Sequence, residues 1–136
     1  MDAPIIKVVT QRHVADCGVA CLAMLLGVSY ENALVAVAQV APDVCVSGLW
    51  MKHLQAAAKL LGCRLVRKRH FELDSDTGLL SFSSKRWKLD HLAVLREGLV
   101  IETDGTIYDA DVYLAVHKAK TGTLLIAEVI HDPIRR

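Results

Sequence analysis

Three residue types that perform acyl-transfer chemistry occur in this chain in an informative order: an amide, a thiol and an imidazole. Cys17 stands where a polar loop passes into an apolar run, and Gln11 lies upstream of it on that loop. The reactive form of cysteine is the thiolate, which the unpaired N–H groups and the dipole at a helix N-terminus favour. The Gln11 amide and the Cys17 N–H would offer two donors to an oxyanion. The pattern predicts a nucleophile mounted at the start of a helix.

The run that follows Cys17 predicts the helix that carries it. Nearly all residues from Ala20 to Leu26 are small or aliphatic helix formers, and Gly27 offers a left-handed stop. We therefore expect a buried helix that begins near Cys17. Asp16 is predicted to cap this helix, and Cys21 to lie in the core, as free cysteines commonly do.

One histidine stands at the head of an apolar strand. The strand pattern from His91 to Leu95 is followed by a second one from Leu99 to Thr103, with a turn close to Glu97-Gly98 between them. His91 is therefore placed to serve as the general base for Cys17. The other histidines have no comparable context; they are His13, His53, His70, His117 and His131.

A longer set of residues carries a resemblance to a known family. The bacteriocin-processing cysteine peptidases begin with a similar run, matched here by Gln11, Asp16-Cys17-Gly18, Ala20-Cys21-Leu22, Met24 and Gly27. Members of that family are papain-like domains that cut peptide leaders after a double glycine and usually form the cytosolic N-terminus of an ABC exporter. The resemblance continues more weakly over Ser47 to Gly62, returns at Asp90 to Asp109, and stops from Asp111 onward.

The resemblance implies a catalytic apparatus and a class of substrate. It implies a Cys, His and Asp triad with a Gln in the oxyanion hole, carried by Cys17, His91, an Asp downstream and Gln11. The substrate would be a peptide or protein with small residues, such as a Gly pair, before the cut. We expect a stand-alone domain that acts on a separate precursor or beside a separate transporter.

The triad carboxylate is open between three residues. In the resembled family it lies on the strand after the histidine. A two-residue turn at Glu97-Gly98 would place His91 opposite Asp104, on the same face and within about 5 Å from Cβ to Cβ. Asp104 is thus the first choice, although an aspartate before a glycine is also an ordinary turn residue. A longer turn or a bulge would bring up Asp109 instead, and Glu102 is a third, weaker candidate.

Other functions fit the same residues. A triad of this kind also supports acyl transfer or amide hydrolysis on non-peptide substrates, and a non-catalytic module could bind leader-like peptides. Retention of Gln11, Cys17 and His91 together argues against the non-catalytic module. His13, Cys17 and Cys21 are spaced for one helix face, but structural zinc usually takes four ligands in short paired spacings. We therefore expect neither a metal nor another cofactor.

Composition limits the classes of protein to which this chain could belong. A chain of 136 residues with 53% hydrophobic content is expected to form one domain, residues 1–136, with a single core. A net charge of +1 offers no field for nucleic acid. The longest apolar stretch, Val19 to Val28, is about half of what a membrane span needs, and Met1 to Thr10 lacks the features of a secretory signal. Four cysteines in such a chain do not indicate a disulfide scaffold, so a cytoplasmic location is expected.

The hydrophobic period changes from helical to alternating halfway along the chain. Ser29 and Ser47 are plausible N-caps, and Pro42 and Gly62 plausible stops, for helices over Tyr30 to Val40 and Leu49 to Leu61. The second half predicts strands with one short helix among them: Cys63 to Arg67, Gly78 to Ser83, His91 to Leu95, Leu99 to Thr103, Thr106 to Tyr108, the helix Val112 to Lys118, and Thr123 to Ile130. Helices followed by an antiparallel sheet make an α+β domain, which fits the papain-like fold. Ile5 to Val9 could be an edge strand or a cover for the first helix.

Overall fold

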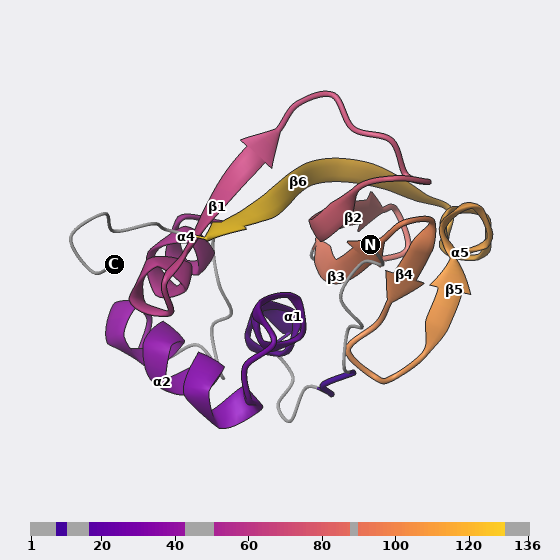
Figure 1. Ribbon diagram of the computed structural model, residues 1–136. Coiled ribbons are helices and arrows are strands. Elements are labelled where there is room, and N and C mark those ends of the chain that lie inside the picture. Colours follow the sequence, from indigo (N-terminus) through magenta and orange to yellow (C-terminus); the bar gives the residue numbers. More distant parts are fainter. Residues whose placement is uncertain (1–7, 11–16, 43–50, 88–89, 130–136) are drawn as a thin grey trace.

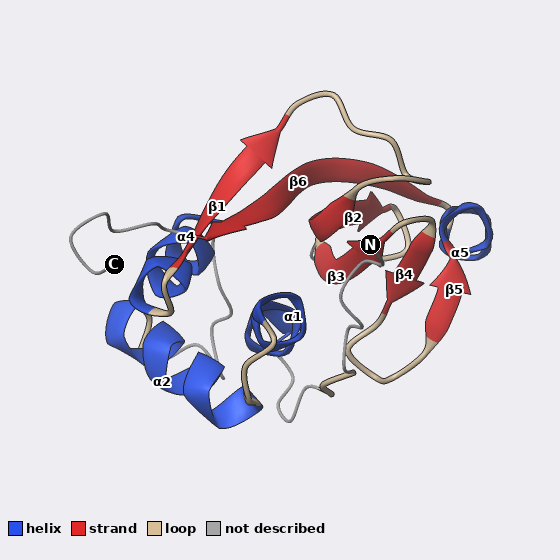
Figure 2. Cartoon of the chain, viewed as in Figure 1, coloured by secondary structure: helices blue, strands red, loops and turns tan. Residues whose placement is uncertain are grey.

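The computed structural model describes residues 8–10, 17–42, 51–87 and 90–129. Helices come first along the chain and an antiparallel sheet follows, so the predicted α+β class is confirmed. Figure 2 shows the early helices gathered on one side of the strands, with one further helix at the opposite end of the sheet. Several predicted features lie outside the described residues: Gln11, His13, Asp16, Cys45, Ser47, His131 and most of Ile5 to Val9. No helix in the described part is long and apolar enough to cross a membrane.

The first helix, α1, spans Cys17–Leu26 and is buried almost throughout. Its residues from Gly18 to Met24 are all buried, as expected of a helix that is apolar on every side. Gly27 ends it with a φ of 70°, and the Val28 N–H then donates to the Ala23 carbonyl at 3.1 Å. This is the hydrogen bond of a Schellman C-cap, so the predicted stop at Gly27 is confirmed.

Two further helices pack beside α1. Helix α2 spans Tyr30–Val40, as predicted, and the Ser29 Oγ accepts a hydrogen bond from the Asn32 N–H at 3.0 Å. Helix α4 spans Met51–Leu60 and ends before Gly62, whose φ is 84°. Its buried side is formed by Leu54, Ala57 and Ala58.

The sheet has six strands in the order β1-β6-β2-β3-β4-β5, and every neighbouring pair is antiparallel. The last strand enters the middle of the sheet, between β1 and β2. Helix α5, Ala110–His117, lies between β5 and β6 in the chain. The strands are β1 Cys63–Lys68, β2 Thr77–Ser84, β3 His91–Arg96, β4 Leu99–Ile101, β5 Ile107–Asp109 and β6 Ala119–Val129.

Alternating strand residues build a separate apolar cluster on each face of the sheet. Leu92 and Val94 of β3 join the cluster that contains α1, α2 and α4. Ala93 and Leu95 join the other cluster, which contains Tyr113 of α5. In Figure 1, α1 is seen end-on between α2 and the β3–β4 part of the sheet, while α5 lies beyond β4 and β5. The helix that carries Cys17 is thus held directly against the strand that begins with His91.

The hairpin of β3 and β4 has the predicted turn. Arg96 pairs with Leu99, and the two turn residues Glu97 and Gly98 have φ values of 44° and 90°, which identifies a type I′ turn. However, β4 ends at Ile101, earlier than predicted.

The early end of β4 comes from a second turn. The Glu102 N–H donates to the Thr106 carbonyl at 2.8 Å, and the Gly105 N–H donates to the Glu102 carbonyl at 3.1 Å. Gly105, with a φ of 92°, allows the chain to reverse there. The ladder with β3 therefore stops before it reaches the position opposite His91.

Candidate active site

Cys17 is partly exposed at the first position of α1. One helical turn further on, the buried Cys21 Sγ lies 3.4 Å from the Leu92 carbonyl, to which its thiol donates. Burial is the main cause that raises the pKa of Cys21 well above its usual value, and the charges of Cys17 and Glu102 add to it. Cys21 is therefore a neutral core thiol that ties α1 to β3, next to His91.

His91 stands between a thiol and a carboxylate. Its Nε2 lies 2.8 Å from Glu102 Oε1, and the Cys17 side chain is its other hydrogen-bond partner. The His91 and Glu102 side chains are only 26% and 16% exposed. Because Nε2 is engaged by Glu102, the remaining ring nitrogen, Nδ1, is available for Cys17. The three side chains form a chain of contacts from the start of α1 to the end of β4.

These contacts change the protonation of His91. Burial is the largest influence and acts to lower the pKa of His91, but the hydrogen bonds and negative charges of Cys17 and Glu102 together outweigh it and raise the pKa to about 10. The imidazolium is therefore favoured at neutral pH. An imidazolium beside Cys17 is the arrangement that stabilises a thiolate nucleophile.

An aromatic ring packs against His91. The Trp87 ring meets the His91 ring edge-on, with centroids 5.9 Å apart, and also packs against the His117 ring at 5.5 Å. An apolar ring beside His91 lowers the local dielectric and strengthens the contact between His91 and Glu102. Nothing in the spacing of the sequence pointed to Trp87, because its ring contacts with His91 and His117 depend on the tertiary structure.

Asp104, the first choice of the sequence analysis, is exposed and occupies a turn. Its Oδ1 accepts a hydrogen bond from the Thr106 N–H at 2.9 Å. The Thr106 side chain and then the Thr106 N–H are the main causes that lower the pKa of Asp104, and the charge of His91 contributes least. The carboxylate that meets His91 is that of Glu102.

The geometry of the hairpin explains why Glu102 is the partner. In the β3–β4 ladder, Val94 pairs with Ile101. When the same register is extended by one pair, Glu102 lies beside Ala93, on the same face of the sheet as His91. A diagonal neighbour in a sheet is within reach of a long side chain. The small side chain of Ala93 leaves that path open. The strand alternation and the small Ala93 side chain can both be read from the sequence. They favour Glu102 over Asp104 as the partner of His91 once β4 is known to end early.

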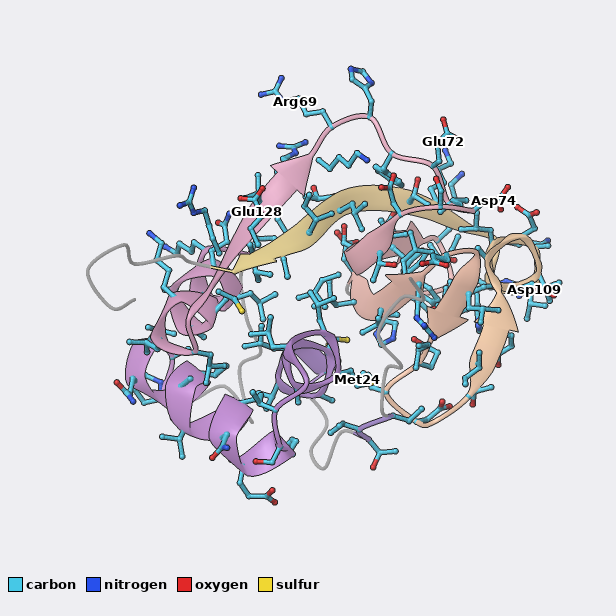
Figure 3. All side chains as sticks on the ribbon, viewed as in Figure 1. Met24, Arg69, Glu72, Asp74, Asp109 and Glu128 are labelled. Atoms are coloured by element: carbon cyan, nitrogen blue, oxygen red, sulfur yellow. The ribbon has the colours of Figure 1, made fainter. Side chains whose placement is uncertain are left out.

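Asp109, the second choice of the sequence analysis, lies at the other end of the hairpin. It pairs with Leu99 at the turn and is the N-cap residue of α5, where its side chain makes no capping hydrogen bond. It lines a shallow hollow with Asp74. Figure 3 shows Asp109 on the outer side of β5, away from α1.

The described residues do not form a metal-binding site. No group of three histidine, cysteine, aspartate or glutamate side chains in these parts of the chain is arranged to hold a metal ion. The set of His13, Cys17 and Cys21 cannot be assessed as a whole, because His13 lies outside the described residues.

Comparisons with known proteins identify the fold. The sequence matches no protein-family model and no curated protein. The structure is similar to the crystal structure of a double glycine motif protease from an AMS/PCAT transporter, solved in complex with the leader peptide. The TM-score is 0.61 with 20% sequence identity, and the match covers 92% of each chain. The chain therefore has the α+β papain-like peptidase fold of that protease.

Proposed function

We propose that this chain is a cysteine peptidase in which Cys17 is the nucleophile, His91 its proton partner and Glu102 the orienting carboxylate. The observation that carries the proposal is the position of His91, which contacts both Cys17 and Glu102 at the start of a buried helix. The likeness to a double glycine motif protease supports the same class of reaction.

The proposed reaction follows the chemistry of thiol acyl transfer. The Cys17 thiolate attacks the scissile carbonyl, and the His91 imidazolium gives its proton to the leaving amine as the C–N bond breaks. His91, now neutral, takes a proton from water, which attacks the thioester and releases the acid, leaving the Cys17 thiolate beside the His91 imidazolium. Glu102 keeps the ring oriented through Nε2 and stabilises its cationic form.

The oxyanion of the tetrahedral intermediate needs donors. We assign this role to the Cys17 N–H and the Gln11 side-chain amide, the pair that the sequence analysis proposed. Two such donors act where negative charge develops and are worth more in a site shielded from water.

Glu102 takes the place that the sequence analysis gave to Asp104 or Asp109. Support comes from the 2.8 Å contact between Glu102 and His91, while Asp104 caps a turn through Thr106. A glutamate performs the same task as an aspartate when its longer side chain starts from a more distant backbone position.

The proposed substrate is a peptide or protein cut after small residues, such as a Gly pair. The similar protease was solved with a leader peptide, and the resemblance of the Gln11 to Gly27 run supports the same substrate class. We propose a cytoplasmic site of action on a separate precursor, or beside a separate transporter.

The first test measures which cysteine reacts. The protein is treated with iodoacetamide near neutral pH, and mass spectrometry follows the labelling of Cys17, Cys21, Cys45 and Cys63. Cys17 should label first, because among the three cysteines that the structure describes only Cys17 combines a helix N-terminus with a histidine partner. His91→Ala should slow that labelling while the circular dichroism spectrum stays unchanged. Uniform labelling, or protection of Cys17 in the folded protein, contradicts the proposal.

The second test concerns the reaction. Synthetic peptides with Gly-Gly at one position, and matched peptides with Leu-Leu there, are incubated with the protein and with Cys17→Ser. Cleavage after the Gly pair by the wild type alone is expected. Transfer of the acyl group to an added amine in preference to water would instead identify an acyltransferase.

A further inference from the structure

We infer that Tyr113 is a positioning residue of this site: its buried hydroxyl holds the Glu102 carboxylate in place against His91 from the α5 face of the sheet. The inference rests on the proposed function, because it extends the contacts of Cys17, His91 and Glu102 by one residue. It assigns to α5 a role in the reaction.

The starting point is an unusual polar atom in the core. Tyr113 has no exposed surface, and no described group meets its hydroxyl with full hydrogen-bond geometry. Buried hydroxyls are nearly always paired, so this group needs an explanation. Burial, followed by the charge and hydrogen-bonding of Glu102, raises the pKa of Tyr113. The hydroxyl therefore keeps its proton and stays a donor. Tyr113 packs in the same cluster as Ala93, beside which the hairpin register places Glu102.

The ring of Tyr113 is held rigidly. Its centroid lies 4.8 Å from that of Phe82, 4.6 Å from that of His117 and 5.5 Å from that of Tyr108. Phe82 is the residue of β2 that pairs with His91. A tyrosine has only two side-chain torsions before its hydroxyl rotor, so a packed ring fixes the position of its oxygen. The hydroxyl is thus preorganised relative to the strand that carries His91.

Glu102 has room for this second partner. Its Oε1 contacts His91, while an ionised carboxylate has about four acceptor positions on two oxygens. A glutamate side chain also loses more rotamer freedom than an aspartate when it is held in one conformation. A second donor to the carboxylate restricts that freedom. Catalytic hydrogen bonds are often long in the free enzyme and tighten when substrate is bound, which fits a hydroxyl without full hydrogen-bond geometry in the free protein.

The test compares Tyr113→Phe with Tyr108→Phe as the matched control. Each change removes one hydroxyl and keeps the ring, and Tyr108 packs against Tyr113 without a place in the proposed machinery. Turnover of a Gly-Gly peptide should fall about tenfold in Tyr113→Phe, with near-UV circular dichroism unchanged, and stay within about twofold of wild type in Tyr108→Phe. The alkaline limb of the pH profile should move in the same direction as in Glu102→Gln, by a smaller amount.

A double variant separates positioning from general packing. In the Glu102→Gln background, Tyr113→Phe should cause no further loss, because the hydroxyl acts only through the carboxylate. Equal losses in both backgrounds overturn the inference, as does wild-type turnover in Tyr113→Phe when Cys17→Ser, His91→Ala and Glu102→Gln all lose activity. If those three variants retain full activity, the proposed function fails first and the inference fails with it.

Discussion

His91 is the residue that joins the nucleophile to a carboxylate, and the identity of that carboxylate is the sharpest difference between sequence and structure. The strand alternation expected from the sequence places both Asp104 and Glu102 on the same face of the hairpin as His91. Only Glu102 has the length to reach back from the end of β4 and hydrogen-bond to Nε2. Asp104 is instead bonded to Thr106 in the turn that follows.

The structure therefore reverses the mutational order expected from the sequence. Glu102→Gln should lower kcat/KM on a Gly-Gly peptide by at least about tenfold, equivalent to about 1.4 kcal/mol, because the amide cannot stabilise the imidazolium by charge. Asp104→Asn should cost less than about threefold, since an asparagine can still accept from the Thr106 N–H. A large loss in Asp104→Asn with full activity in Glu102→Gln would assign the carboxylate to Asp104.

The raised pKa of His91 makes a prediction about pH. The imidazolium that protonates the leaving amine is present below about pH 10 and is lost as pH rises through that value. The alkaline limb of kcat/KM should therefore lie near pH 10 in the wild type. Glu102→Gln should move it to lower pH, because a hydrogen bond and a negative charge that favour the cation are removed. Titration of the His91 ring by NMR checks the same shift without substrate.

At the scale of the elements, α1 is defined by its two ends. Its first residue is the proposed nucleophile, and its last turn is closed by Gly27 in the left-handed region and by the bond from Val28 to Ala23. Local signals determine both ends, which is why the sequence predicted them. The buried middle only needs residues that are apolar and helical.

Replacing the glycine at the C-terminal cap of α1 should measurably change the free energy of unfolding. Nothing lies within 4 Å of a Cβ added at Gly27, so Gly27→Ala introduces backbone strain without a clash. It should lower the free energy of unfolding by about 1–2 kcal/mol, the cost of a left-handed non-glycine residue, as measured by urea denaturation. Cys17 lies at the opposite end of the helix, so its labelling rate in the folded protein should be unchanged. A stability equal to wild type would show that the cap relaxes easily.

For the whole molecule, the decisive feature is the insertion of β6 between β1 and β2. This strand joins β1, which follows the helices in the chain, to the β2–β3–β4 part that carries His91. At the contact of β2 with β6, a Cβ added at Gly78 would run into the Leu125 carbonyl. The two strands approach so closely that only a glycine fits.

Gly78→Ala should therefore weaken the entire sheet. The added methyl group forces the backbones of β2 and β6 apart, at a cost of about 1–3 kcal/mol, as for other overpacked sites. Ser83→Ala, at an exposed position of the same strand, is the control and should stay within about 0.5 kcal/mol of wild type. Denaturant unfolding monitored by tryptophan fluorescence measures both. Equal stability of the two variants would contradict the close approach.

The sequence by itself determined the features that depend on neighbours along the chain. These are the α1 helix with Cys17 at its start, the caps at Ser29 and Gly27, the type I′ turn, and His91 at the head of a strand. Each follows from helix propensity, cap chemistry, glycine conformation or hydrophobic period, which act over a few residues.

Only the tertiary structure decided the features that depend on distant segments. The central place of β6 follows from pairing with strands far away in the chain. The choice of Glu102 follows from the second turn, which ends β4 before the position of Asp104. Trp87 packs against His91, and Tyr113 joins the cluster of Ala93 because helix α5 packs on that face of the sheet. Such contacts arise from packing and long-range strand pairing, so the spacing of residues along the sequence does not decide them.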